Sequence, residues 1–177
     1  MSKTNIKING DRIYLRKVEL SDVDQEYVDW LNDPDVNQFL ETRHETQTID
    51  SVQKYVEKMV SLDDELFLAI CLQDNHKHIG NIKLGPINSI HKYAEISLFI
   101  GDKNQWGKGF ATTSISILSD YAFSELNLHK MMAGCYSNNI GSIKAFCNAG
   151  FVIEGQLKSH YLFNASYLDR ICLYRLA

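Results

Sequence analysis

One stretch near the middle of the chain, residues 94–123, constrains the fold more than any other. It opens with a run of apolar, β-branched and aromatic residues, which is typical of a strand. Small and apolar residues then recur every three or four positions from Ala111 to Ala122, which is the spacing of a buried helix face. The loop between them contains Gly107 and Gly109. We therefore predict a strand, a glycine loop and a helix.

A glycine loop that leads into a helix is a candidate anion site. The first N–H groups of a helix lack internal acceptors and lie at the positive end of its dipole. Lys108 adds positive charge, but the P-loop pattern is not met, because Gly109 follows it instead of a hydroxyl residue. The three spaced glycines of a dinucleotide fingerprint are also missing. From the loop alone, an anion site and a tight turn that binds nothing are equal alternatives.

A second motif further along the chain resolves this choice. Residues 105–112 (Gln-Trp-Gly-Lys-Gly-Phe-Ala-Thr) resemble the acyl-coenzyme A pyrophosphate loop of the GCN5-related N-acetyltransferases, the GNAT family. Their Trp-Gly-Lys-Gly-Phe-Ala form resembles the branch of ribosomal-protein alanine and serine acetyltransferases. Residues 138–146 lead into Gly150 and Phe151 and resemble the second motif of the same family. The motifs stand in the family's order and separation, and the resemblance runs from Ile13 to the C-terminus.

The pattern along the rest of the chain predicts an α/β fold. Strands are expected at 12–18, 66–72, 78–84, 93–100, 131–136, 151–157 and 168–176, and helices at 21–31, 36–40, 48–60, 112–123 and 141–148. Ser21 and Thr48 are the expected N-caps. We expect one domain over residues 1–177, with a mixed, mostly antiparallel, twisted sheet of six to seven strands flanked by helices. The resemblance implies that strands 93–100 and 131–136 splay apart and form the cofactor cleft.

Composition excludes several other classes of protein. A formal net charge of -4 argues against a nucleic-acid binder that works through bulk basicity. No apolar run is long enough to span a membrane, and no apolar N-terminal segment suggests a signal peptide. The 4 cysteines are scattered without a Cys-x-x-Cys pair, which favours reduced thiols in the cytoplasm. The 6 histidines lack metal-site spacing, so we expect no metal.

The resemblance implies acetyl-coenzyme A (acetyl-CoA) as co-substrate. The implied contacts are Leu98 and Phe99 on the strand, Trp106, Gly107, Lys108, Gly109, Phe110, Ala111 and Thr112 in the loop and helix start, and Asn139 and Ser142 in the second motif. Backbone N–H groups of the loop would hold the pyrophosphate. A backbone N–H near Leu98 or Phe99 would polarise the thioester carbonyl. Lys108 either supplements this charge or is a solvated loop lysine.

Two residues are the candidate catalytic groups. Glu95 is a carboxylate within an apolar strand, where burial would favour a general base, although an outward-facing glutamate is an equal alternative. Phe146 occupies the position where many family members carry a proton-donating tyrosine. Ser142 resembles the serine that assists the leaving thiolate in the ribosomal-protein branch, and its alternative role is to satisfy the start of a helix.

The acceptor site is predicted from the early helices and the second half of the chain. The polar link 41–47 is the best candidate for acceptor selectivity, with Glu41 and Arg43 as its charged members, and Tyr136 and His160 are further candidates. The resemblance implies a primary amine as acceptor: a small amine such as an amino-sugar nucleotide or polyamine, or a protein N-terminus. A domain that binds coenzyme A without turnover is the alternative function. A homodimer is an open alternative.

Overall fold

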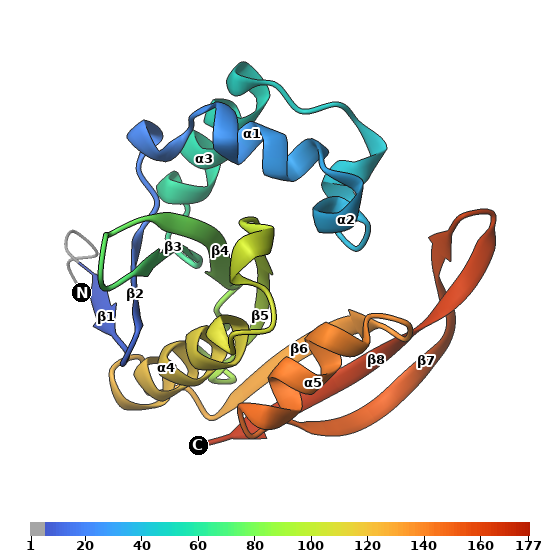
Figure 1. Ribbon diagram of the computed structural model, residues 1–177. Coiled ribbons are helices and arrows are strands. Elements are labelled where there is room, and N and C mark those ends of the chain that lie inside the picture. The colour runs from blue at the N-terminus through green and yellow to red at the C-terminus, as the bar shows by residue number, and fades with distance from the viewer. Residues whose placement is uncertain (1–5) are drawn as a thin grey trace.

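The computed structural model describes residues 6–177, which form an α/β fold around an eight-stranded sheet in the order β1-β2-β3-β4-β5-β6-β8-β7 (Figure 1). The strands are β1 (Lys7–Asn9), β2 (Ile13–Lys17), β3 (Leu66–Leu72), β4 (His78–Leu84), β5 (Tyr93–Ile100), β6 (Lys130–Tyr136), β7 (Val152–Phe163) and β8 (Ser166–Leu176). The helices are α1 (Gln25–Asn32), α2 (Pro34–Asn37), α3 (Ile49–Ser61), α4 (Phe110–Ser124) and α5 (Ile140–Asn148). Short 3-10 turns lie at Leu20–Asp22, Glu41–His44 and Lys103–Gln105.

The predicted fold class is confirmed, with one strand more than expected. All neighbouring strands pair antiparallel except β5 and β6, which are parallel. The crossover between those two strands contains α4, as the long connection predicts. The sequence does not predict β1, because a strand of three residues is too short to show an alternating pattern. The last two strands are also longer than their apolar cores suggest.

The start of the first helix corrects one prediction. Ser21 lies in a 3-10 turn, and α1 begins only after Asp24, whose carboxylate accepts a hydrogen bond from the Tyr27 N–H at 2.9 Å. Asp22 is not part of the helix, because it forms a two-point pair with the Arg16 guanidinium at 2.6 and 2.7 Å. That long-range contact fixes the chain as a turn ahead of the helix.

The next two helix starts show how local chemistry sets element boundaries. The predicted Thr48 cap is confirmed, and it forms a reciprocal capping box with Ser51. The short helix predicted at 36–40 instead begins at Pro34, because Asp33 caps it and proline suits the first helical position. The chain therefore turns sharply between α1 and α2.

Helices cover both faces of the sheet, which gives two apolar cores (Figure 1). Helices α4 and α5 pack on one face, and α1 and α3 pack on the other. All seven residues of β3 are buried, because alternate side chains enter opposite cores. Leu68 and Ile70 belong to the core beneath α4, whereas Phe67 and Ala69 belong to the core beneath α1 and α3.

The parallel strands β5 and β6 part from each other in the middle of the sheet. Their pairing runs only from Tyr93 and Lys130 to Glu95 and Met132. Beyond that point β5 continues to Ile100, and it pairs only with β4 on its other side. The divergence that the family resemblance implies is therefore present, and it opens at the end of β5 that leads into the glycine loop.

Gly80 provides a test of how tightly β4 and β5 pack. A Cβ added there would overlap the backbone of Phe99 and Ile100, and backbone cannot move aside as a side chain can. We expect Gly80→Ala to lower the free energy of unfolding by about 1–3 kcal/mol, measured by urea denaturation. Gly155→Ala on β7 is the control, because a Cβ there meets nothing within 4 Å. Equal stability of the two variants would contradict this packing.

Candidate active site

The glycine loop directs backbone donors into solvent at the start of α4. Gly107 and Gly109 have φ angles of 73° and 82°, in the left-handed region that glycine adopts without strain. Gly109 is the N-cap of α4 and makes no side-chain cap, so the N–H groups of the first turn are left for an external anion. The Thr113 N–H already belongs to the helix and donates to the Gly109 carbonyl at 3.0 Å. This geometry fits a phosphate group.

Positive charge beside the loop comes from a residue that the motif does not include. The Arg12 guanidinium lies 4.8 Å from the centre of the Phe110 ring, and its Nη2 donates to the Lys108 carbonyl at 2.6 Å. The Lys108 ammonium donates to the Gln105 side chain at 3.1 Å. The Trp106 indole donates to the Ile100 carbonyl at 2.8 Å, which ties the loop to the end of β5. Two cations therefore lie beside the loop.

The backbone of β5 presents free polar groups to the opening. In an antiparallel pair, alternate residues direct both N–H and C=O toward the same neighbour. The Glu95 carbonyl accepts from the Gly85 N–H at 2.9 Å, and the Gly101 N–H donates to the Ile79 carbonyl at 2.8 Å, so both face the β4 side. Leu98 lies three positions, an odd number, from both Glu95 and Gly101. Its N–H therefore faces the β6 side, where the strands have parted. The backbone groups of Phe99 face β4.

The second motif forms the start of α5 close to the end of β6. The Asn139 side-chain oxygen accepts from the Ser142 N–H at 3.1 Å and caps the helix. The Ser142 hydroxyl lies 3.3 Å from the Cys135 thiol, whose pKa is raised by burial. Phe146 is 2% exposed and packs edge-on against Phe151, so this position is part of the core.

Glu95 is half-buried and ion-paired, not deeply buried as its apolar neighbours suggest. Its carboxylate lies 2.6 Å from Nη2 of Arg170, and the two side chains are 38% and 25% exposed. Arg170 reaches it from β8 by crossing β6 at Gly134, where an added Cβ would overlap the guanidinium. The Arg170 side chain can therefore pass over β6, which lies between β5 and β8, and contact Glu95.

Three of the four predicted acceptor residues come together at the open end of β6. Nη2 of Arg43 donates to the Tyr136 hydroxyl at 2.8 Å, and that hydroxyl donates to Oε1 of Glu41 at 3.2 Å. Burial raises the pKa of Tyr136, and the hydrogen bond from Arg43 opposes this shift. His160 is exposed on β7 and lies edge-on to Tyr161, which stacks on Tyr136 at 4.0 Å. The ring of Tyr161 therefore separates His160 from the cluster of Glu41, Arg43 and Tyr136.

Aromatic side chains that the sequence does not single out complete this cluster. Phe39, which follows α2, stacks on Phe163 of β7 at 5.7 Å. Both rings also lie within 6 Å of Tyr136, at 5.5 and 5.9 Å. The segment after α2 and the β7–β8 hairpin therefore meet over the end of β6. Only their proximity in the fold reveals Phe39 and Phe163, because these two residues lie more than a hundred positions apart in the sequence.

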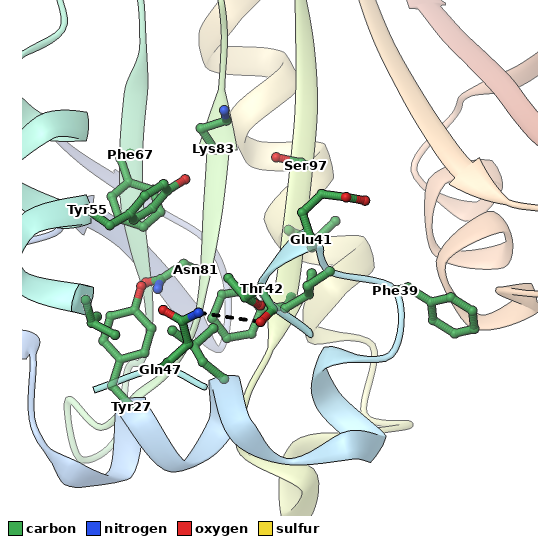
Figure 2. Close-up of a pocket in the computed structure, with 15 residues that line it drawn as sticks. Tyr27, Phe39, Glu41, Thr42, Gln47, Tyr55, Phe67, Asn81, Lys83 and Ser97 are labelled. Atoms are coloured by element: carbon green, nitrogen blue, oxygen red, sulfur yellow. Dashed lines mark hydrogen bonds between the residues drawn. The ribbon is translucent and has the colours of Figure 1, made fainter. Parts of the chain in front are cut away.

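A cavity of about 380 Å³ lies between β5 and the α1–α3 layer (Figure 2). Its floor is formed by alternate residues of β4 and β5, including Asn81, Lys83, Ser97 and Phe99. Its walls come from α1, α3 and the segment 39–42. Glu95 precedes Ser97 by two positions on the same face of β5, because side chains alternate along a strand. The cavity, Glu95 and the Leu98 N–H therefore adjoin the same part of β5.

Comparison with known proteins identifies the family. The model of the acetyltransferase (GNAT) domain matches residues 12–152, and the chain belongs to this family. An N-acetyltransferase of Bacillus licheniformis is 31% identical over 85% of this chain and 84% of its own length. A spermidine N(1)-acetyltransferase of Vibrio cholerae is 38% identical, but that match spans only 55% of this chain and 57% of the relative.

Solved structures agree with this assignment. The spermidine N-acetyltransferase of Vibrio cholerae, in complex with CoA and spermine, has a TM-score of 0.83 and 27% identity, over 94% of this chain and 96% of that one. A GNAT acetyltransferase from Bacillus anthracis superposes with a TM-score of 0.84 at 21% identity, over 97% and 98% of the two chains. The similar proteins named here do not single out the ribosomal-protein branch that the loop sequence resembles. No helix within residues 6–177 is long and apolar enough to cross a membrane.

Proposed function

We propose that this GNAT acetyltransferase moves the acetyl group of acetyl-CoA to a primary amine by direct attack in a ternary complex. The observation that carries the proposal is the position of the glycine loop at the parted end of β5 and β6, with the Leu98 N–H facing the opening. The loop is suited to the pyrophosphate, and the Leu98 N–H is suited to the thioester oxygen. The neighbouring structure that contains CoA supports acetyl-CoA as the co-substrate.

In the proposed reaction, the amine nitrogen forms a bond to the acetyl carbon and the carbon–sulfur bond breaks. An alkyl ammonium with a pKa near ~10.4 must first lose a proton, and we assign this role to Glu95, acting through water. As the carbon–sulfur bond breaks, the newly bonded nitrogen loses its second proton to water, and the sulfur leaves as the CoA thiolate, which Ser142 stabilises by donating a hydrogen bond. Arg170 holds the Glu95 carboxylate in place.

The chemical identity of the acceptor amine is a further part of the proposal. A polyamine is supported by the relatives that are spermidine acetyltransferases. A protein N-terminus is the alternative that the ribosomal-protein resemblance suggests, and an amino-sugar nucleotide is a third. Glu41, Arg43 and Tyr136 are the proposed contacts at the rim of the site, and His160 lies further out.

A thiol-release assay tests this function. Free CoA thiol should appear only when protein, acetyl-CoA and a suitable amine are all present. The alternative function is a CoA-binding domain without turnover. It is supported by Phe146, which is buried in the core and cannot donate a proton to the leaving thiolate. Tight binding of acetyl-CoA with no thiol release across a broad panel of amines would support that alternative and reject the enzyme.

Ser142→Ala tests the proposed assistance to the leaving thiolate. Loss of one hydrogen bond should lower kcat by about fivefold, with little change in KM for acetyl-CoA. The helix cap should survive, because Asn139 bonds the Ser142 backbone and not its hydroxyl. Ser142→Thr retains a hydroxyl and should keep most of the activity. A kcat in Ser142→Ala equal to that of the unmodified protein would remove this role.

We also propose a cytoplasmic location and a homodimer. The four cysteines are free thiols, which supports a cytoplasmic location. Edge strand β7 exposes Val152, Ile153, Leu157 and Leu162, which supports a homodimer formed through this strand. Sedimentation velocity measurements should then give twice the monomer mass, and a single monomeric species at micromolar concentration would contradict it.

A further inference from the structure

A contact from outside the glycine loop fixes one of its peptides. Nη2 of Arg12, in the turn between β1 and β2, donates to the Lys108 carbonyl at 2.6 Å. The peptide between Lys108 and Gly109 is trans, since the cis bond among residues 6–177 is Gly85–Pro86. In a trans peptide the C=O and the following N–H point in opposite directions. The Gly109 N–H therefore points away from Arg12.

The Gly109 N–H is a free donor at the start of α4. Gly109 is exposed, and no hydrogen bond formed within residues 6–177 uses its N–H. The carbonyl of the same residue is occupied, because it accepts from the N–H and the hydroxyl of Thr113 at 3.0 and 3.2 Å. The loop therefore presents this donor to solvent on the side of the peptide that faces away from Arg12.

The glycine loop does not fix this orientation by itself. Rotation of the peptide plane, through ψ of Lys108 and φ of Gly109, would exchange the positions of the carbonyl and the N–H. Glycine adopts φ angles of both signs about equally readily, so Gly109 does not oppose the rotation. After such a rotation, the partial negative charge of the carbonyl would face a bound phosphate and repel it. A partner outside the loop is needed to hold the carbonyl back.

Arg12 is itself held in place by the sheet and by α4. Its guanidinium lies 4.8 Å from the centre of the ring of Phe110, which is buried and is the first residue of α4. The Arg12 carbonyl accepts from the Gln73 N–H at 3.0 Å, and Nε2 of Gln73 donates to the Gly10 carbonyl at 3.3 Å. The turn is thus attached to the residue that follows β3. The donor to Lys108 is therefore positioned by elements other than the loop.

We propose that Arg12 is a positioning residue for acetyl-CoA, which holds the Lys108–Gly109 peptide so that the Gly109 N–H donates to the cofactor pyrophosphate. This inference rests on the proposed function and adds to its binding site a residue that lies outside both sequence motifs. The guanidinium acts from the carbonyl side of the peptide, away from the cofactor. Loss of Arg12 should therefore weaken the binding of acetyl-CoA and leave the acetyl-transfer step unchanged.

Arg12→Met tests this role, because methionine keeps an apolar chain over Phe110 but has no donor for the Lys108 carbonyl. Isothermal titration calorimetry should give a Kd for acetyl-CoA about tenfold above that of the unmodified protein, as expected for one lost hydrogen bond to a charged group. A Kd equal to that of the unmodified protein would overturn the inference. If the unmodified protein itself does not bind acetyl-CoA, the proposed function fails instead.

Lys7→Met is the matched control on the same β1–β2 hairpin. It removes a cation that lies 4.3 Å from the centre of the Tyr14 ring. Tyr14 belongs to the core beneath α1 and α3, on the face of the sheet opposite to α4. The Kd for acetyl-CoA should not change in this variant. A rise as large as that in Arg12→Met would attribute both losses to net charge and overturn the inference.

Salt separates orientation of the peptide from simple attraction between charges. At an ionic strength of about 1 M the Debye length falls to about 3 Å, so attraction between exposed charges is largely screened. An effect of orientation remains under these conditions. Arg12→Met should therefore still bind acetyl-CoA about tenfold more weakly than the unmodified protein at the same salt concentration. If the difference disappears at high salt, Arg12 acts only through its charge and the inference fails.

The amide proton of Gly109 reports on the proposed bond directly. Selective ¹⁵N-glycine labelling restricts the spectrum to the 10 glycines of the chain, and comparison with Gly109→Asn assigns the signal. Saturation with CoA should move the Gly109 proton downfield in the unmodified protein, because the N–H donates to a phosphate oxygen. The shift should be smaller in Arg12→Met saturated with CoA. Shifts of equal size in the two proteins would contradict the inference.

Thermal melting establishes that Arg12→Met is folded. In the thiol-release assay the folded variant should have a higher KM for acetyl-CoA and a kcat within about twofold of the unmodified protein. A lower kcat with an unchanged KM would contradict the inference. If Arg12→Met does not fold, Arg12→Lys replaces it, because lysine lacks the planar guanidinium that stacks on Phe110. Its Kd should rise at low and at high salt, and an unchanged Kd would overturn the inference.

Discussion

Replacing Gly109 with Asp should raise the Kd for acetyl-CoA by about 100-fold, or about 2.7 kcal/mol. Gly109 is the N-cap of α4 with φ 82°, and Asp tolerates this region better than most residues. Any side chain at this φ is strained, so an aspartate should also lower the stability of the fold. The same carboxylate would occupy the N–H groups and repel the pyrophosphate. The effect of the charge on the Kd is therefore judged against a variant that carries the same backbone strain.

Gly109→Asn is the matched control for this prediction. Asparagine has nearly the same shape and also tolerates a positive φ, but it adds no charge. Its Kd for acetyl-CoA, measured by isothermal titration calorimetry, should rise much less than that of the aspartate variant. Equal losses in both would mean that shape and not charge is responsible. Unchanged affinity in Gly109→Asp would place the cofactor elsewhere.

Glu95→Gln should lower kcat by about 100-fold, because a positioned general base contributes at least this factor. The Kd for acetyl-CoA should stay within about twofold, since binding relies on the loop and not on this carboxylate. The variant depends on amine that is already neutral in solution. Its rate should rise about tenfold per pH unit up to the pKa of the amine, near ~10. The rate of the unmodified protein should reach its plateau at a lower pH than the rate of the variant.

The ion pair with Arg170 requires a control for a purely structural effect. Arg170→Lys keeps a positive charge, with less exact geometry, and should retain more activity than Glu95→Gln. Both variants should melt close to the temperature of the unmodified protein, because the pair is 25–38% exposed. If Glu95→Gln keeps the wild-type kcat and pH profile, Glu95 is not the base.

The sequence predicts the fold wherever the information is local. Residues 66–72 are continuously apolar, and this alone indicates a strand covered on both faces, as β3 is. Thr48 is recognisable as a cap because its partner Ser51 is three residues away. The start of α1 is not recognisable in this way. Ser21 and Asp24 are both acceptable caps, and the choice depends on Arg16 binding Asp22.

The candidate site shows the same difference between local motifs and long-range contacts. The glycine loop and the Asn139 motif are continuous segments, so the sequence alone places their residues. Arg12 lies 96 positions from Lys108, and Arg170 lies 75 positions from Glu95, so only the packed sheet brings these pairs together. Glu95 is half-buried, between the buried and outward-facing alternatives that the sequence left open. Its environment depends on Gly134 in a neighbouring strand and not on its neighbours along β5.

The cavity between β5 and the α1–α3 layer was the least accessible feature from the sequence. Each of its walls comes from a different element, and residues such as Asn81 and Phe67 appear in the sequence only as members of strands. The polar link 41–47 is visible in advance because it is local, and two of its residues do reach Tyr136.

The most direct test of the central claim is mass spectrometry of the amine after incubation with acetyl-CoA labelled with ¹³C in the acetyl group. The proposed function predicts that the amine gains one labelled acetyl group for each CoA released, and that Gly109→Asp abolishes this gain at limiting acetyl-CoA. Release of CoA without labelled amine would show hydrolysis instead of transfer. Neither product, from protein that binds acetyl-CoA, would contradict the assignment as an N-acetyltransferase.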